Sequence, residues 1–210
     1  CVRIDLDPAG SPEEISTLVR EVTSSDVEDQ VAHRGGDRLV PRLRRHRLED
    51  GETVTLWDDA TYLITGGLSG LGLALARWMV QRGARHLVLL GRRAPSEATL
   101  GVIAEMEAEG AVVHVRSVDV SVPAEVGRLL AEVRSDMPPL RGVVHSAVVL
   151  EDHSIFEMNE ATFWPPLLPK ALGAWNLHAM LGDAPLDFFV FYSSGAAVLG
   201  SPGQSNYAAA

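Results

Sequence analysis

Two serines and a tyrosine near the end of the sequence are the residue types that carbonyl chemistry needs. Ser193 and Ser194 close an apolar run, and Tyr207 follows Ser194 by thirteen residues. A carbonyl that accepts a hydride becomes an alkoxide, so hydrogen-bond donors must point at its oxygen and a proton must reach it. Ser194, at the end of a predicted strand, can supply a fixed hydroxyl donor, and Tyr207, on a predicted helix, can supply the proton.

Lys170 is the only lysine in the sequence. A free tyrosine has a pKa of about 10, which is too high for efficient proton exchange at neutral pH. A nearby ammonium group stabilises the phenolate form of a tyrosine and lowers its pKa. We therefore nominate Lys170 as the residue that activates the tyrosine.

A glycine-rich segment far upstream has the composition of a phosphate-binding turn. It lies between a strand-like run and a helix-like run and consists of Thr65, Gly66, Gly67, Leu68, Ser69, Gly70, Leu71 and Gly72. In such turns the backbone N–H groups approach a pyrophosphate, and the helix N-terminus favours its negative charge. We interpret the segment as a dinucleotide-binding turn; a tight turn with a purely structural role is the alternative.

The next predicted strand ends in Gly91, Arg92 and Arg93. NAD-dependent enzymes usually place an acidic residue here, against the ribose hydroxyls. Two guanidinium groups would instead pair with the 2′-phosphate of NADP. Because a hydrogen bond to a charged group contributes about 1.5–3 kcal/mol, we expect at least a roughly tenfold preference for NADP. The alternative is that both arginines are solvated surface residues.

Two further strand ends complete the predicted cofactor site. Asp119 and Val120 end the third strand and could hold the adenine edge. His145, Ser146 and Ala147 end the fourth strand and would lie beside the nicotinamide ribose. His145 could equally be a core histidine whose hydrogen bonds are satisfied within the protein.

Strand-like and helix-like patterns alternate over residues 61–194. Compact apolar runs, typical of strands buried on both faces, cover residues 61–65, 86–90, 112–118, 141–146 and 186–194. Apolar stripes at helical spacing lie between them: Leu71, Leu75, Trp78 and Met79 form one, and Val126, Leu129, Leu130 and Val133 another. The alternation predicts βαβ units and an α/β fold, a Rossmann-like doubly wound parallel sheet with strand order 3-2-1-4-5.

The first part of the chain follows a different pattern. We expect residues 1–57 to form a unit distinct from residues 58–210, with a linker at 47–59. A short strand is predicted over residues 2–6, followed by a helix that Ser11, Pro12 and Glu13 would start well.

A second strand of this unit is predicted over residues 38–43, after a turn at Gly35 and Gly36. Pro41 lies within that run and suggests that the strand is at a sheet edge, because proline has no N–H to donate.

The composition is that of a globular protein, with 46% hydrophobic and 22% charged residues. The net charge of −10 argues against a nucleic-acid partner, since it provides no domain-wide basic field, and we interpret the arginines of residues 42–47 as solvated. No apolar stretch approaches the ~20 residues that span a bilayer. The single cysteine, Cys1, fits a reducing compartment. We expect a cytoplasmic protein without a membrane partner or a metal site.

The residues described above resemble the short-chain dehydrogenase/reductase superfamily. The resemblance is closer to the ketoreductase domains of modular type I polyketide synthases, and it rests on residues 65–93, 145–152, 169–178 and 191–210. In that family the catalytic lysine lies in a Pro-Lys-x-x-Gly segment twenty-four residues before the serine, which matches Lys170. The resemblance implies NADPH as cofactor and a β-ketoacyl thioester on an acyl carrier protein as substrate. It also implies that other domains of the same synthase are partners.

The resemblance gives a meaning to both ends of the chain. Residues 1–57 resemble the end of a truncated structural subdomain, Rossmann-like but without a cofactor, that braces the catalytic one. In the family, further strands and lid helices close over the acyl substrate and follow the tyrosine. We therefore expect residues 58–210 to be truncated at the C-terminus, with the later strands of the sheet missing. The short linker leaves no room for an enoylreductase domain.

Five residues resemble markers of stereochemical type. Glu151 and Asp152 match the Leu-Asp-Asp motif of B-type ketoreductases, with Glu151 in place of the first aspartate. Leu199 occupies the position of the A-type tryptophan, eight residues before the tyrosine, while Pro202 and Asn206 match the B-type pattern. The resemblance implies a 3R alcohol product. The alternative is that the two acids are merely solvated loop residues.

Two other functions were weighed against this one. A stand-alone reductase of small ketones or sugars would have no need of the bracing segment at residues 1–57. A catalytically inert scaffold would have no need of Ser194, Tyr207 and Lys170 together.

Overall fold

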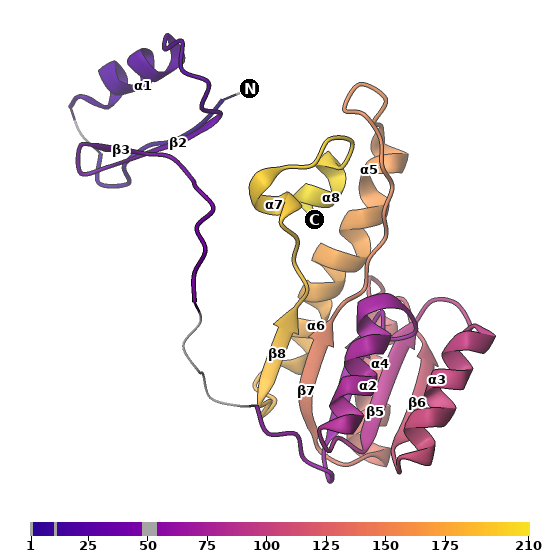
Figure 1. Cartoon of the computed structure of the whole chain (residues 1–210). Helices are drawn as coiled ribbons and strands as arrows, with labels where there is room; N and C mark the ends of the chain where they lie inside the picture. The colour runs from indigo at the N-terminus through magenta and orange to yellow at the C-terminus, as the bar shows by residue number, and fades with distance from the viewer. Residues whose placement is uncertain (1, 11, 48–53) are drawn as a thin grey trace. The chain divides into compact units, whose positions relative to one another are not determined.

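The chain divides into two compact units, Cys1–Thr53 and Val54–Ala210. The computed structural model describes residues 2–10, 12–47 and 54–210 (Figure 1). The division falls four residues before the expected boundary at residue 57. Each unit contains its own sheet, and the two are described separately.

The larger unit is built on a five-stranded parallel sheet. Its strands are β4 (Thr61–Thr65), β5 (His86–Gly91), β6 (Val112–Ser117), β7 (Leu140–His145) and β8 (Phe188–Phe191). They are hydrogen-bonded in the order β6-β5-β4-β7-β8, with every neighbouring pair parallel. Numbered within the unit, this order is 3-2-1-4-5, so the predicted Rossmann-like topology is confirmed.

Helices cover both faces of this sheet (Figure 1). They are α2 (Gly70–Gln81), α3 (Glu97–Ala108), α4 (Pro123–Asp136), α5 (Glu160–Leu167), the π-helical turn η1 (Leu168–Leu172), α6 (Gly173–Leu181), α7 (Ala196–Leu199) and α8 (Ser205–Ala209). Helices α2 and α3 share one hydrophobic cluster with one face of the strands, and α4 and α6 share a second with the opposite face. On β4, Tyr62 and Ile64 belong to the first cluster and Leu63 to the second, as the two-residue period of a strand requires. No helix in the described ranges is both long and apolar enough to cross a membrane.

Of the two apolar stripes predicted for helices, the one in α4 is buried and the one in α2 is only partly buried. All four stripe residues of α4 are buried. Of the four predicted stripe residues of α2, Met79 is buried and Leu75 is half-buried against the core, whereas Leu71 is 72% and Trp78 44% exposed, so the predicted stripe was partly wrong. The face that packs on the sheet also contains Gly72, Ala76 and Val80. A Cβ at Gly72 would overlap the Gly66 carbonyl oxygen, so glycine lets this end of the helix lie close to the turn that precedes it.

The smaller unit has a three-stranded sheet and one helix. Its elements are β1 (Arg3–Asp5), α1 (Glu14–Val22), β2 (Gln30–Arg34) and β3 (Asp37–Leu39), with β2 parallel to β1 and antiparallel to β3. The central strand β2 was not predicted, because its sequence mixes polar and apolar residues without a clear period. Strand β3 is at the sheet edge, as expected, but it ends at Leu39, before Pro41.

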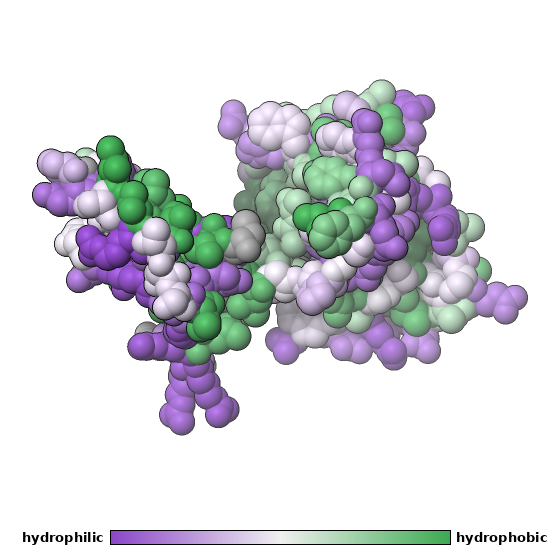
Figure 2. All heavy atoms as spheres, turned by 90° about the horizontal axis from the view of Figure 1, so that it is seen from above, coloured by the Kyte–Doolittle hydropathy of each residue, from purple (hydrophilic) through white to green (hydrophobic). Residues whose placement is uncertain are grey.

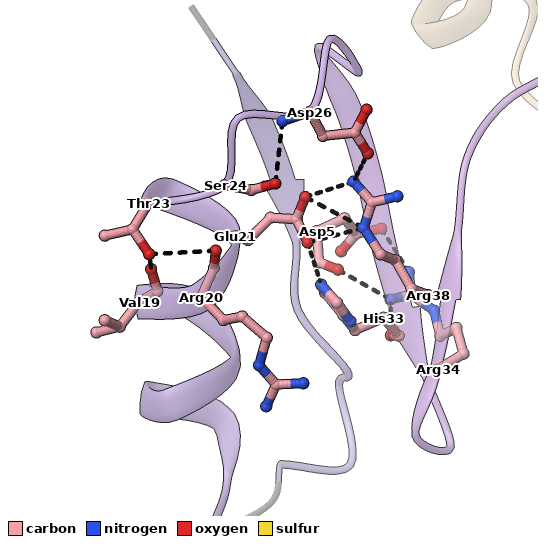
Figure 3. A network of polar contacts seen from close by, with 10 residues as sticks. All are labelled: Asp5, Val19, Arg20, Glu21, Thr23, Ser24, Asp26, His33, Arg34 and Arg38. Atoms are coloured by element: carbon pink, nitrogen blue, oxygen red, sulfur yellow. Dashed lines mark hydrogen bonds and ion pairs between the residues drawn. The ribbon is translucent and has the colours of Figure 1, made fainter.

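Polar contacts rather than apolar packing connect α1 with its sheet, since α1 has no buried residue. The Glu21 carboxylate accepts hydrogen bonds from Arg38 Nε at 2.9 Å and Nη2 at 2.6 Å and lies 3.5 Å from His33 Nε2 (Figure 3). Arg38 also pairs with Asp26 at 2.8 Å. The hydrogen bonds from Arg38 lower the pKa of Glu21 below its usual value.

Gly142 of β7 provides a test of packing in the larger sheet. It pairs with Phe188 of β8, whose ring stacks on Tyr62 with centroids 5.9 Å apart, and a Cβ at Gly142 would overlap the Phe188 ring. We predict that Gly142→Ala lowers the free energy of unfolding of this unit by about 1–3 kcal/mol, because both rings must shift. Urea unfolding followed by tryptophan fluorescence measures it, since all four tryptophans lie within residues 54–210.

The matched control is Gly101→Ala, in the middle of α3, where an added Cβ meets nothing within 4 Å. Alanine favours a helix interior over glycine, so this variant should gain up to about 1 kcal/mol. A Gly142→Ala protein as stable as the parent would contradict the packing argument.

Candidate active site

A cleft of about 590 Å³ opens at the carboxyl ends of β4, β5 and β6. Nine residues expected to hold a dinucleotide line it: Thr65, Gly66, Leu68, Ser69, Arg92, Arg93, Asp119, Val120 and Ala147. Ligands of open parallel sheets bind at this edge, where the strand order reverses. The strand order reverses at β4, the first strand of the unit, because β5 follows on one side of it and β7 lies on the other.

The glycines of the turn permit close approach of backbone to backbone. Gly66 has φ +64°, and a Cβ there would lie 2.7 Å from the Ser146 carbonyl oxygen. A Cβ at Gly72 would overlap the Gly66 carbonyl oxygen. Gly67, Gly70, Leu71 and Gly72 belong to the turn without lining the cleft. Glycine at these two positions therefore lets the turn lie directly against the backbone after β7 and against the start of α2.

Arg92 and Arg93 are exposed at the rim of the cleft, directly after β5. Within the described parts of the chain neither guanidinium has a hydrogen-bond or ion-pair partner. Elsewhere in those parts arginines do pair with acids, as Arg116 does with Glu132 and Arg141 with Asp187. Two unpaired cationic groups at a cleft edge suit an anionic ligand.

Several cleft residues were missed by the sequence analysis. Ser96 caps α3 by accepting a hydrogen bond from Thr99 N at 3.2 Å, and Thr99 Oγ1 donates to the Leu68 carbonyl at 3.0 Å. Both line the cleft and connect α3 with the glycine-rich turn. A serine just before a helical run is an N-cap signal that could have indicated them. Pro169 also lines the cleft but comes from a distant helix and carries no such signal.

Asp119 and Val120 make contacts within the protein as well as lining the cleft. The Asp119 carboxylate accepts from Ser121 N at 2.9 Å and from Ser121 Oγ at 2.6 Å. The Val120 carbonyl accepts from the buried Asn176 amide at 2.9 Å. The loop after β6 is thus held in place from both sides.

His145 does not line the cleft; its side chain is buried, with 4% of the residue exposed. Its Nδ1 lies 2.8 Å from Thr65 Oγ1, and its Nε2 lies 3.2 Å from the Lys170 carbonyl oxygen. Burial lowers the pKa of His145. Of the two roles considered for this residue, these contacts fit a satisfied core histidine. Ser146 likewise contributes its backbone, which donates to Thr65 Oγ1 at 3.1 Å.

The expected catalytic lysine and tyrosine lie together. Lys170 Nζ is 5.3 Å from the centre of the Tyr207 ring and donates a hydrogen bond to the Tyr192 carbonyl at 2.8 Å. Lys170 is partly buried in the turn η1, next to the cleft residue Pro169. The ammonium group therefore lies over the face of the Tyr207 ring, within the range of a cation–π contact.

Ser194 lies two residues after Tyr192, beyond the end of β8. Its Oγ accepts a hydrogen bond from Ala196 N at 3.1 Å, which fixes the oxygen and leaves the hydroxyl hydrogen available. In the described part of the chain no hydrogen bond joins Ser194 to Tyr207. Neither residue lines the cofactor cleft.

The residues expected to control stereochemistry belong to the segment before α5 and to the region of α7 and α8, and hydrogen bonds join these two parts of the chain. Asn206 is fully buried; its amide donates to the carbonyls of Glu151 at 2.7 Å and Thr162 at 2.8 Å, and its Oδ1 accepts from Tyr207 N at 2.8 Å. The Asp152 carboxylate accepts from Gln204 Nε2 at 3.1 Å.

Glu151 Oε1 lies 3.1 Å from His153 Nε2, and His153 N donates to the Gly203 carbonyl at 2.8 Å. The two acids are therefore bonded within the protein rather than only to solvent. Leu199 is 58% exposed, and Pro202 is exposed as well.

Exposed apolar residues surround these loops. They include Leu150, Ile155, Phe156, Val198 and Leu199, in the segment before α5 and in α7, at the top of the larger unit in Figure 1. Figure 2, which looks down on this end, shows apolar side chains gathered on the surface of the larger unit. The lysine–tyrosine pair thus lies near an apolar surface as well as near the polar cleft.

A model of the KR domain family matches residues 60–210. The chain is 40% identical, over 99% of its length, to a phenolphthiocerol/phthiocerol polyketide synthase subunit of Mycobacterium tuberculosis (strain CDC 1551 / Oshkosh), of which it covers 11%.

Among solved structures, the chain is similar to a ketoreductase domain from the bacillaene assembly line (TM-score 0.82, 32% identity), covering 98% of this chain and 49% of that one. It is also similar to an A-type ketoreductase from a modular polyketide synthase (TM-score 0.84, 33% identity), covering 98% and 44%. The chain spans about half of these solved chains or less, and about a tenth of the mycobacterial synthase. By its sheet topology, its glycine-rich turn and these matches, the chain belongs to the ketoreductase domain family of polyketide synthases.

Proposed function

We propose that this chain reduces the β-keto group of an acyl thioester, carried on an acyl carrier protein, to a 3R β-hydroxyacyl thioester with NADPH. The observation that carries the proposal is the contact of the Lys170 ammonium with the Tyr207 ring beside a dinucleotide-sized cleft. The match to a mycobacterial polyketide synthase, of which the chain covers 11%, supports an acyl substrate of this kind and partner domains in the same synthase.

The cleft fits the proposed cofactor. The glycine-rich turn leads into the N-terminus of α2, and its residues Thr65, Gly66, Leu68 and Ser69 line the cleft, where backbone N–H groups and the helix N-terminus would favour a pyrophosphate. Arg92 and Arg93 have no partners in the described chain and would hold a 2′-phosphate. When bound, NADPH supplies the hydride.

Three side chains would complete the reduction. Ser194 Oγ, fixed by Ala196 N, donates its hydrogen to the carbonyl oxygen and so stabilises the charge that develops there. Tyr207 transfers its phenolic proton to that oxygen. Lys170, held by the Tyr192 carbonyl, stabilises the phenolate that remains.

The hydrogen bonds between residues 151–153 and residues 203–206 would contribute to stereochemical control. Residues 151–153 are fixed to residues 203–206, while Leu199 lies exposed on α7. Residues 151–153 and Leu199 would border two entrances to the site and so select the side from which a flexible ketoacyl arm approaches. Since hydride comes from one fixed face, approach from the opposite side inverts the alcohol. A difference of about 1.4 kcal/mol between the two directions of approach gives a tenfold ratio of products.

A stand-alone reductase is less well supported. The match to the mycobacterial synthase extends over 99% of the chain and therefore includes residues of the smaller unit. A reductase of small ketones would need only the larger one.

Catalysis can be tested in the intact synthase module that carries these residues. We predict that Tyr207→Phe abolishes reduction while NADPH affinity stays within about twofold, because only the proton donor is lost. Ser194→Ala should lower turnover by roughly 10²–10³, the usual effect of removing one such donor. Tyr62→Phe makes the same chemical change far from the cleft, where Tyr62 accepts from Trp57 N, and should retain turnover. A Tyr207→Phe module with a near-normal rate would falsify the assignment.

Cofactor choice can be tested on the chain itself by fluorescence titration with NADPH and NADH. We predict that NADPH binds at least about tenfold more tightly, through charge-assisted bonds to Arg92 and Arg93. The double variant Arg92→Ala with Arg93→Ala should lose most of that ratio. Arg128→Ala removes an exposed arginine of α4 outside the cleft and serves as the control. Equal dissociation constants for the two cofactors in the unmodified chain would be incompatible with the proposal.

Product stereochemistry can be read by chiral chromatography of the alcohol released from the intact module. For a simple β-ketoacyl chain we predict mainly the 3R alcohol, because residues 150–152 resemble the B-type Leu-Asp-Asp motif, with Glu151 in place of the first aspartate, and position 199 lacks the A-type tryptophan. Mainly 3S alcohol would overturn this assignment and leave the catalytic one intact.

A further inference from the structure

We infer that His145 is a positioning residue for Lys170, which holds the turn η1 against the end of β7 and so directs the lysine side chain at Tyr207. The inference rests on the proposed function, in which Lys170 acts on Tyr207. It gives a role to a buried imidazole that does not reach the cofactor cleft.

The hydrogen bonds around His145 determine its tautomer. Thr65 Oγ1 accepts from the backbone N–H groups of Ser146 at 3.1 Å and Ala147 at 3.0 Å. Both lone pairs of this hydroxyl are therefore in use, so its hydrogen points at His145 Nδ1, 2.8 Å away. A neutral imidazole that accepts at Nδ1 carries its hydrogen on Nε2. That hydrogen points at the Lys170 carbonyl oxygen, 3.2 Å away.

The bond reaches the backbone of Lys170 at an irregular part of its helix. Lys170 is the middle residue of the π-helical turn Leu168–Leu172, in which Gly173 N–H bonds to the carbonyls of Leu168 and Lys170. A π-turn inserts one residue into the helical ladder and is often found at functional sites. His145 Nε2 is thus a second donor at the Lys170 carbonyl, and it comes from outside the turn, so it ties the turn to the end of β7.

Two neighbouring residues place the turn within reach of His145. A Cβ at Gly173 would lie 2.6 Å from Val120 Cγ2 and 3.3 Å from His145 Cε1, so glycine permits this close approach. One turn later, the buried Asn176 amide donates to the Val120 carbonyl at 2.9 Å. The helix is thereby fixed to the ends of β6 and β7, with His145 as the contact nearest to Lys170.

The contacts of the Lys170 ammonium group show why the position of the η1 backbone matters. Lys170 Nζ bonds to the Tyr192 carbonyl and lies 5.3 Å from the Tyr207 ring centre. Movement of the η1 backbone shifts the ammonium relative to the phenol, and a displacement of about 1 Å at an active site can cost about 10² in rate. His145 touches none of the expected reacting groups, so its effect would pass through Lys170.

Three replacements of His145 in the intact synthase module separate this role from general stability. Glutamine can place its amide N–H near the position of Nε2 and so donate to Lys170. Asparagine is shorter and reaches only the position of Nδ1, beside Thr65, and leucine retains neither bond. We expect His145→Leu and His145→Asn to lower kcat by about 10², with KM and NADPH affinity within about twofold. His145→Gln should retain kcat to within about tenfold of the parent.

A double-mutant cycle with Lys170→Ala completes the test. If His145 acts through Lys170, the variant with both His145→Leu and Lys170→Ala is no slower than Lys170→Ala alone. Additive losses, an unchanged kcat in His145→Leu, or equal rates in the glutamine and asparagine variants would each overturn the inference. Should the leucine variant not fold, the comparison of glutamine with asparagine decides. Full activity of Lys170→Ala would instead overturn the catalytic assignment itself, so the two failures are distinguishable.

Discussion

The Thr65 hydroxyl is the interaction on which the arrangement of the site depends. It lies at the end of the first strand of the larger unit, is fully buried, and bonds to three consecutive residues of β7 and its following loop. The same residue begins the glycine-rich turn, whose Gly66 fits closely against Ser146. One buried side chain therefore holds the glycine-rich turn and the end of β7 in register. An unsatisfied polar group at this depth would cost about 1–3 kcal/mol, so the geometry is strongly preferred.

The carboxyl edge of the sheet carries two different surfaces. Residues after β4, β5, β6 and β7 line the cleft, which has Arg92 and Arg93 at its edge. The elements after β7 and β8 carry the lysine, the serine and the tyrosine, and exposed apolar residues lie in the same segments. In the proposed reaction the dinucleotide would use the first surface and the acyl chain the second, both at the carboxyl edge of a parallel sheet. His145 lies where they meet, bonded to Thr65 on one side and to the lysine backbone on the other.

Residue patterns predicted the strands and helices that recur along the larger unit and the positions of rare residue types. The strand order of the larger unit followed from alternating apolar runs, and the only lysine in the chain lies 5.3 Å from the centre of the Tyr207 ring. Periodicity was a poorer guide to α2, where Met79 is buried with Gly72, Ala76 and Val80 while Leu71 and Trp78 are exposed. Strand β2 was not predicted from the sequence. It pairs with a strand on each of its edges, and this pairing leaves no pattern in its own residues. The bonds of His145 join residues far apart in the sequence, so no local pattern could reveal them.

Asn206 shows how a residue can matter for specificity without touching a substrate. Its side chain is fully buried and uses its donors and its acceptor within the protein. Those bonds join the Glu151 backbone, the start of α5 and the backbone N–H of Tyr207. The loop that carries Asp152 is therefore positioned by the same residue that precedes the expected proton donor. Because loop and tyrosine share this support, in the proposed reaction a change at Asn206 would disturb the direction of substrate approach and the direction of proton delivery together.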